Sequence, residues 1–412
     1  MVGITIISLG IAMVIVEVYR DKDLPPFVYL ITLSFFPPLV RIFIGALLGI
    51  GLIMVSILEL NRSILAPFMS QRRGALIDAM YSHSFKQRGN KIVALGGGTG
   101  LPAVLRGLKS ETSNITAIVT VADDGGSSGK LRRELGVLPP GDLRNNIAAL
   151  ADDEDMMTQL FQYRFGEGGL EGHSFGNLFL TALANITGSM DRALVEAARV
   201  LAIQGRVLPS TLQDITLMAE LRNPDGTGLR RVIGESQITL AGGIIDRVFI
   251  KPESARAYPE SIRAILNANL VVIGPGSLYT SIIPNLLVNG IPEAIRASSA
   301  IRIYVCNVAT QEGETTNFTV ADHIVALERN AGRGLFHYVL ANNSYPDTQG
   351  TPTQYVTPAP KNHDVWQRYE ICEADLTDPK YPWRHSPAKL NRAIVAIMAK
   401  HQPASATTAQ VG

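Results

Sequence analysis

Lys91–Leu105 reads KIVALGGGTGLPAVL and sets the fold of the chain. A short apolar segment runs into a glycine-rich loop, and a second apolar segment with helical spacing follows it. A strand, a glycine-rich loop and a helix in this order let backbone N–H groups face a phosphate at the helix N-terminus. The stretch therefore predicts an α/β domain with an anion-binding loop. The loop consists of Gly96, Gly97, Gly98, Thr99 and Gly100.

The order of these glycines narrows the choice of ligand. The loop lacks the GxGxxG order of a dinucleotide site and the Gly-Lys-Ser/Thr ending of a P-loop. A tight turn without any ligand is the structural alternative. A dehydrogenase is a weaker one, since Asp123 and Asp124 end the next predicted strand, where an acidic residue would bind a ribose.

Composition excludes some classes of protein. The chain has 412 residues, 46% of them hydrophobic and 18% charged, which predicts a sizeable core. A net charge of +1 argues against nucleic-acid binding, which usually requires a basic domain. Cys306 and Cys372 lie far apart, as expected for free thiols in a reduced compartment.

Residues 1–60 are apolar enough to suggest a membrane anchor of two or three segments. The segments are Val2–Val18, Phe27–Val40 and Ile42–Leu58, and Pro37-Pro38 interrupts the middle one. A crossing helix needs about 20 apolar residues, with a range of about 17–25. A cleaved signal peptide fits poorly because no basic region precedes the first segment.

Basic residues follow this region in a predicted linker over 61–90, where Asp78 opposes Arg62, Arg72, Arg73 and Lys86. The positive-inside rule therefore predicts a protein of the cytoplasmic membrane whose main domain lies in the cytoplasm. That domain is predicted over 91–400, and the tail over 401–412 is predicted to be disordered.

A second polar loop follows the predicted strand Asn114–Ala122. It reads DDGGSSG and contains Asp123, Asp124, Gly126, Ser127 and Ser128. The adjacent carboxylates could hold Mg²⁺ or accept hydrogen bonds from ligand hydroxyls. Helix capping by Asp or Ser is the structural alternative.

Further polar loops come later in the chain. Asp142 and Arg144 follow Pro139-Pro140, and His173 and Asn177 stand at the start of an apolar helix. Arg144 could form two hydrogen bonds with a phosphate or carboxylate. The predicted strands Leu270–Ile273 and Ile301–Val305 then run into two more loops. These loops contain Gly276, Ser277, Thr280, Asn307, Thr310 and Gln311.

Together these elements predict a Rossmann-like, doubly wound, mostly parallel sheet with ligands at the carboxyl ends of its strands. A small β-rich subdomain is predicted as an insertion over 204–265. Its expected strands are Val207–Leu208, Ile215–Leu221, Gly234–Ile238 and Ile244–Ile250.

The motifs GGGTG, ADDGGSSGKLR, PPGDLRN, HSFGN, GPGSLYTS and NVATQEGET occur in this order. With them the chain from about 91 to 390 resembles the bacterial gluconeogenesis factor family, whose members bind UDP-sugars and are tied to cell shape and envelope growth. That family is similar in fold to 2-phospho-L-lactate transferase. Ala309 and Glu312 depart from the family's methionine and proline.

The resemblance implies a regulator of cell shape and carbon metabolism that binds a ligand of the UDP-N-acetylglucosamine type. The N-terminal segment looks like that of membrane-anchored members. Homo-oligomers and a protein kinase acting on a threonine near Thr315 are further implied partners. The alternative is a Mg²⁺-dependent transferase of a phosphorylated group. Its catalytic residues would be Asp123, Asp124, Arg144 and His173.

Overall fold

The computed structural model describes residues 36–65, 86, 88–152, 154–223, 228–347 and 354–401. The chain divides into two units, Met1–Tyr81 and Ser82–Gly412, and each is described by itself. The tail predicted to be disordered lies outside the described residues, apart from His401.

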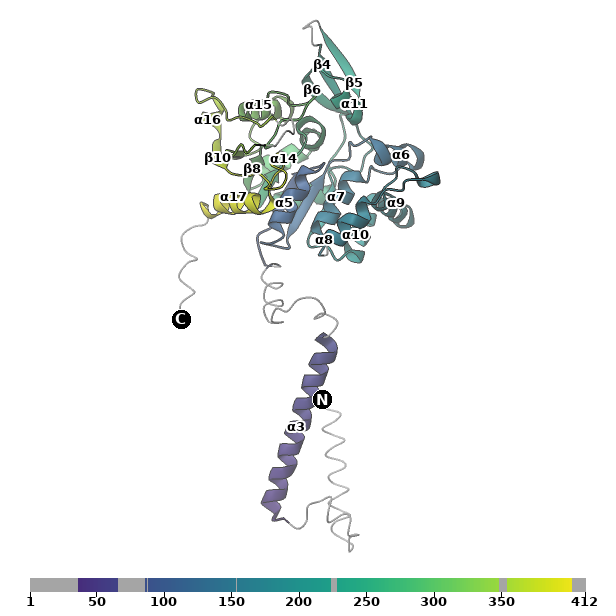
Figure 1. The fold of residues 1–412 in the computed structure, drawn as a ribbon, viewed down its shortest axis with the longest axis vertical. Coiled ribbons are helices and arrows are strands. Elements are labelled where there is room, and N and C mark those ends of the chain that lie inside the picture. The colour runs from purple at the N-terminus through teal and green to yellow at the C-terminus, as the bar shows by residue number, and fades with distance from the viewer. Residues whose placement is uncertain are drawn as a thin grey trace. The chain divides into compact units, whose positions relative to one another are not determined.

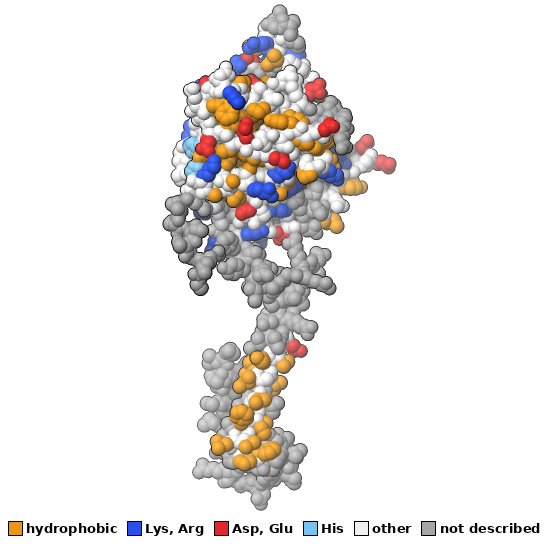
Figure 2. Space-filling model, turned by 60° about the vertical axis from the view of Figure 1, so that its left-hand side comes forward, with side chains coloured by type: hydrophobic (Ala, Val, Ile, Leu, Met, Phe, Trp, Pro, Cys, Tyr) orange, Lys and Arg blue, Asp and Glu red, His pale blue; other side chains and the backbone are white. Residues whose placement is uncertain are grey.

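The first unit contains one described helix, α3 (Pro38–Leu65). Apolar side chains along it are exposed, for example Leu39 at 82% and Phe43 at 70% (Figure 2). Over the described residues, no helix has the length and apolarity needed to cross a membrane. The structure therefore does not support the predicted crossing at Ile42–Leu58. Val2–Val18 lies outside the described residues.

The second unit is built on a seven-stranded sheet in the order β10-β9-β8-β7-β1-β2-β3. Figure 1 labels β8 and β10 of this sheet and the helices around it. All six of its pairings are parallel, which confirms the predicted sheet type. β1, β2 and β7 are buried along their whole length, as expected for strands covered on both faces. The strands are β1 (Ile92–Gly96), β2 (Ile115–Val119), β3 (Arg206–Pro209), β7 (Leu270–Ile273), β8 (Ile301–Val305), β9 (Tyr338–Asn342) and β10 (Glu370–Ala374).

Helices cover both faces of this sheet. α5, α7 and α17 pack in one group and α12 and α14 in another, as right-handed crossovers on either side of β1 require. The larger helices are α5 (Gly100–Leu108), α6 (Gly126–Leu135), α7 (Gly141–Leu150), α8 (Glu154–Gln162), α9 (Phe175–Thr187), α10 (Met190–Val200), α12 (Pro259–Leu266), α15 (Val320–Ala331) and α17 (Pro387–Ala399). The short ones are η2 (Gly168–Leu170), η3 (Leu278–Ile282), α13 (Ile283–Leu286), α14 (Ile291–Ala297) and α16 (Val365–Arg368).

The strand order reverses between β1 and β7, because the chain builds outward from β1 in one direction and from β7 in the other. At such a switch point, neighbouring loops diverge to opposite faces and leave a crevice at the carboxyl ends of the strands. The loops after β1 and β7 border this crevice.

The predicted insertion is present but smaller than expected. An antiparallel sheet in the order β5-β4-β6 is formed by β4 (Thr216–Arg222), β5 (Leu229–Ile233) and β6 (Ile244–Lys251). Residues 206–209 belong instead to the main sheet, as its edge strand β3. The strand predicted at Gly234–Ile238 is wrong: residues 235–240 form a helix, α11 (Glu235–Leu240), which follows Gly234 at a φ of 102°.

Candidate functional site

The loops after β1, β2, β7 and β8 all leave the same edge of the sheet. Their parallel registers place Gly96 beside Val119 and Ile273 beside Tyr304, so the loops that follow start level with one another. We call this side the carboxyl edge. Most of the predicted ligand residues lie here, in two adjoining groups on either side of the Gly97–Gly98 turn.

The first loop packs tightly between the two groups. A Cβ at Gly97 would lie 2.5 Å from Asp142 Oδ2 and 3.4 Å from Ser281 Cβ, so only glycine fits there. Gly98 has a φ of 61°, a left-handed conformation that favours glycine. Its N–H donates to the Asp142 carboxylate. This donor was expected to face a phosphate; in the structure it holds a carboxylate of the protein itself.

Asp123 and Asp124, the acidic residues of the second loop, bind different parts of the protein. Asp123 Oδ1 accepts the Gly125 N–H at 2.9 Å, and burial raises the pKa of Asp123. Asp124 turns toward the inserted subdomain, where its Oδ1 accepts the Ser236 N–H at 2.9 Å. Asp124 therefore fastens α11 to the main domain.

The predicted Mg²⁺ site has no further support. In the part of the chain that the structure describes, no group of three or more His, Cys, Asp or Glu residues is arranged to hold a metal ion. A protein cluster of this size is not required, since Mg²⁺ is usually held by one or two carboxylates together with phosphates and water. Asp123 and Asp124 accept hydrogen bonds from different segments, Gly125 and Ser236, and a Mg²⁺ site at this pair stays a prediction.

His173 and Asn177 come together with the α6 serines in a buried network. Ser127 Oγ lies 3.1 Å from His173 Nδ1 and accepts the Asn177 side-chain amide at 3.1 Å. The same amide reaches Ser128 Oγ at 3.4 Å. The Asn177 Oδ1 atom is buried and has no hydrogen-bond partner in the described structure. The network is pre-organised and leaves one acceptor for a ligand.

Arg144 joins this network from α7. Its Nη1 donates to Ser174 Oγ at 2.5 Å, and its Nη2 donates to Asn145 Oδ1 at 2.9 Å. Burial and the nearby Arg164 lower the pKa of Arg144, whereas Asp142 and Asp123 raise it. The two terminal nitrogens are therefore bound to protein partners, whereas the buried Nε has no hydrogen-bond partner among the described residues. The guanidinium also balances the surrounding carboxylates.

Glu235 is a residue that sequence reasoning missed. It opens α11 in the insertion, and burial together with Asp123, Asp124 and Asp142 raises its pKa to about 8. Burial raises the pKa of Asp142 to about 6. No local motif marks Glu235, because it reaches the carboxyl edge only through the folding of the inserted sheet.

The second group lines a cavity of about 790 Å³ between the loops after β1, β7 and β8. The predicted residues Thr99, Gly100, Gly276, Ser277, Asn307, Thr310 and Gln311 line it. A nucleotide-sized ligand fits this volume, since ligand pockets typically measure about 300–1,000 Å³.

Asn307 fixes the shape of this cavity. Its Oδ1 accepts the Gly276 N–H at 3.2 Å, and its Nδ2 donates to the Gly276 carbonyl at 2.9 Å. Gly100 lies against the same loop, because a Cβ there would be 2.5 Å from the Pro275 carbonyl oxygen. Asn307 thus joins the β7 and β8 loops, and Gly100 allows the β1 loop to pack closely against the β7 loop.

Glu314 accepts hydrogen bonds from two of the predicted residues, Thr280 and Gln311. Its Oε1 accepts from Thr280 Oγ1 at 3.0 Å and from Gln311 Nε2 at 2.9 Å, while Ser277 Oγ donates to Gln311 Oε1 at 2.7 Å. Thr280 is buried and therefore supports the loop instead of facing the cavity. Thr315 is also fully buried, and its hydroxyl accepts the Gln311 N–H at 2.9 Å.

The far wall of the cavity comes from residues that the sequence did not single out as ligand contacts. Arg106 on α5 lines it, as do Tyr381, Trp383 and Arg384 from the turn before α17. Tyr381 and Trp383 rings meet edge to face at 5.7 Å. A Trp and a Tyr beside arginines form a surface on which a nucleobase can stack. The sequence does contain a signal for this surface, because two aromatic residues and an arginine lie within Tyr381–Arg384.

Comparisons with known proteins agree with this architecture. The family model for 2-phospho-L-lactate transferase CofD matches residues 92–377. The gluconeogenesis factor of Bacillus subtilis is 49% identical over 277 residues, which make up 67% of this chain and 86% of that protein. A crystal structure of a Bacillus halodurans protein superposes with a TM-score of 0.70 at 42% identity, covering 75% of this chain and 99% of that one.

A relative from Nostoc sp. is 58% identical over 276 residues, 66% of this chain. The matched region spans 59% of that relative and 64% of a relative from Clostridium acetobutylicum. This chain thus accounts for about three fifths of those two proteins. The family match over residues 92–377 includes the loops after β1, β2, β7 and β8, and the chain belongs to the CofD-like gluconeogenesis factor family.

Proposed function

We propose that the carboxyl edge binds a UDP-sugar of the UDP-N-acetylglucosamine type and that the protein acts as a regulatory binding module. The observation that carries the proposal is the 790 Å³ cavity, which loops from three neighbouring strands line with backbone groups, amides and hydroxyls. In this account, ligand occupancy would regulate cell shape, envelope growth and carbon metabolism.

The cavity offers a different chemistry to each part of such a ligand. The diphosphate would lie at Thr99 and Gly100, where α5 begins and Arg106 adds positive charge. The uracil would stack on Trp383. Carboxylates are good acceptors for sugar and ribose hydroxyls, so Asp123 and Asp142 favour the sugar end near the Gly97–Gly98 turn.

The test is equilibrium binding of UDP-N-acetylglucosamine to the full chain in non-ionic detergent, with and without Mg²⁺. We expect saturable binding and recovery of the intact sugar nucleotide. Absence of saturable binding would contradict the proposal. Conversion to a new phosphorylated product would show an enzyme instead of a module.

The transferase alternative rests on the Ser127–His173 hydrogen bond and on the matching family model. A histidine close to a serine hydroxyl can accept its proton, and Arg144 would counter negative charge that develops in a transition state. His173→Ala should abolish product formation if this alternative holds. If the protein is a binding module, His173→Ala should only weaken UDP-sugar binding.

We further propose that the N-terminal 60 residues attach the protein to the cytoplasmic membrane, on the strength of their apolar sequence. Cell fractionation of the full chain and of a chain lacking residues 1–60 tests this. The full chain should sediment with membranes and the shortened chain should not. A full chain that stays in the soluble fraction would contradict the proposal.

A further inference from the structure

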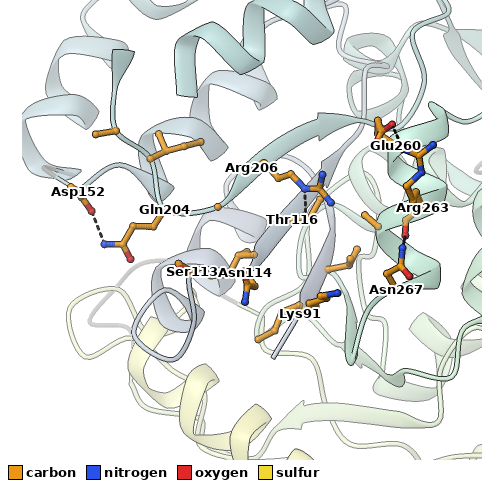
Figure 3. Close-up of a pocket in the computed structure, with 17 residues that line it drawn as sticks. Lys91, Ser113, Asn114, Thr116, Asp152, Gln204, Arg206, Glu260, Arg263 and Asn267 are labelled. Carbon is orange, nitrogen blue, oxygen red and sulfur yellow. Dashed lines mark hydrogen bonds and ion pairs between the residues drawn. The ribbon is translucent and has the colours of Figure 1, made fainter. Parts of the chain in front are cut away.

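A second cavity, of about 700 Å³, lies at the opposite edge of the sheet, around the amino ends of β1, β2 and β3 (Figure 3). We call this side the amino edge. None of the predicted ligand residues lines the cavity. Its walls come from the sheet, from the loop before β3 and from α12, which contributes Glu260, Arg263 and Asn267.

The register of the strands brings two cations to one face of the sheet. Val93 pairs with Thr116, and Thr116 pairs with Arg206. Residues paired in a parallel sheet point to the same face, and Lys91, two residues before Val93, points there too. Lys91 and Arg206 therefore both belong to the cavity wall, as Figure 3 shows.

Arg206 is held in position by a neutral group. Its Nε donates to Thr116 Oγ1 at 2.9 Å. Across the described residues, neither its two terminal nitrogens nor Lys91 Nζ has a hydrogen-bond or ion-pair partner. A guanidinium fixed through Nε presents both terminal nitrogens in the planar geometry that binds phosphate or carboxylate at two points.

The acidic residues of the cavity are already engaged. Glu260 accepts from Arg263 at 2.7 Å along α12, and Asp152 accepts from the Gln204 side-chain amide at 2.6 Å. The Glu260–Arg263 ion pair is neutral overall, whereas the Gln204 amide leaves the charge of Asp152 in place. The cavity wall therefore carries a net positive charge, and among the described residues neither Lys91 nor Arg206 is paired with an acid.

The loop before β3 is shaped to leave this space. Gly205 has a φ of 105°, and a Cβ there would lie 2.6 Å from the Ile115 carbonyl oxygen. Only glycine allows the chain to approach β2 so closely before Arg206 turns into the cavity. The position of Arg206 therefore depends on a specific backbone arrangement.

We propose that the amino edge is a binding site for a small phosphorylated metabolite that carries a second anionic group. Strand spacing places the Cα atoms of Lys91 and Arg206 about 12 Å apart. One phosphate can take the Arg206 guanidinium while a second phosphate or a carboxylate takes Lys91. Ser113 and Asn267 line the space between the walls and offer polar contacts to hydroxyls.

The probes are inorganic phosphate and a hexose bisphosphate, titrated into the full chain in non-ionic detergent at fixed ionic strength. We expect the bisphosphate to bind more tightly than phosphate. Arg206→Gln and Lys91→Gln should each weaken bisphosphate binding at least fivefold. Arg392→Gln is the matched control, an exposed arginine outside both cavities, and should bind as the wild type does.

Two results would overturn the proposal. One is a wild type that binds neither probe saturably. The other is bisphosphate binding that Asn307→Ala abolishes while both amino-edge variants keep it, which would assign the anion to the carboxyl edge. Thermal melting of each variant identifies misfolding, and Lys91→Gln, at the start of the strand, keeps the test valid if Arg206→Gln unfolds.

Discussion

The carboxyl and amino edges of the same sheet differ in charge and in how their charged groups are held. At the carboxyl edge, Asp123, Asp142 and Glu235 crowd together, and backbone N–H groups and serines hold the first two. At the amino edge, Lys91 and Arg206 face a cavity in which no described acidic residue pairs with either of them. This contrast supports the two proposals: a polar ligand bound by pre-organised groups at the carboxyl edge, and an anionic ligand attracted by positive charge at the amino edge.

The largest loss of UDP-sugar binding and stability is expected from Gly100→Ala, which places an extra side-chain atom in the packed carboxyl edge. Gly100→Ala would place a Cβ 2.5 Å from the Pro275 carbonyl oxygen, and backbone cannot move aside as a flexible side chain can. Overpacking of this kind costs about 1–3 kcal/mol. We expect UDP-sugar binding to be lost and the melting temperature to fall by several degrees, as calorimetry would show.

Gly169→Ala is the control for this substitution. Its Cβ would meet nothing within 4 Å, and its φ is not in the left-handed region. Wild-type stability and binding are expected. If both alanine variants behave alike, the close contact between the β1 and β7 loops does not matter for the site.

A smaller effect, confined to one edge, is expected from Asn307→Ala. The change removes both hydrogen bonds to Gly276, each worth about 0.5–1.5 kcal/mol. UDP-sugar affinity should fall about tenfold in a calorimetric titration, or roughly 1.4 kcal/mol. Asn267→Ala, at the amino edge, should leave the UDP-sugar affinity unchanged. An equal loss of affinity in both variants would contradict the proposal that the UDP-sugar binds at the carboxyl edge.

The smallest expected effect is a pH-dependent change in folding stability caused by Glu235. The folded pKa of Glu235, about 8, exceeds its unfolded value of about 4.5, so the folded state binds the proton more tightly and stability falls as pH rises through this window. Glu235→Gln should therefore melt about 2–4 °C above the wild type at pH 9 and close to it at pH 5.

The exposed Glu134→Gln serves as the control for the melting curves, since it changes the same charge away from the cluster. It should show no pH-dependent difference. If Glu235→Gln raises the melting temperature equally at pH 5 and pH 9, the prediction is contradicted. Ionisation of Glu235 would then cost the folded protein little free energy.

Much of the fold could be read from the sequence because its signals are local. The β-branched strands and the polar loops after them predicted the parallel sheet and its carboxyl edge. The same signals failed at Gly234–Ile238, where the left-handed Gly234 precedes a helix. The strand predicted at Val207–Leu208 is present, but it belongs to the main sheet and not to the insertion, because it pairs with β2 over a long separation in sequence.

The sequence predicted most of the residues that meet at the carboxyl edge but not how they are arranged there, and their role as ligand contacts stays a prediction. Asp124, Thr280 and Arg144 were expected at the ligand, yet each binds another part of the protein. Glu235 and Trp383 were not expected there. These outcomes depend on long-range packing, which no motif encodes.

The most direct test of the account is a crystal structure of the protein soaked with UDP-N-acetylglucosamine. We expect the diphosphate at Thr99 and Gly100, with the ligand enclosed by Gly276, Asn307 and Trp383. A sugar nucleotide bound at the amino edge, beside Arg206, with the carboxyl edge empty would contradict it.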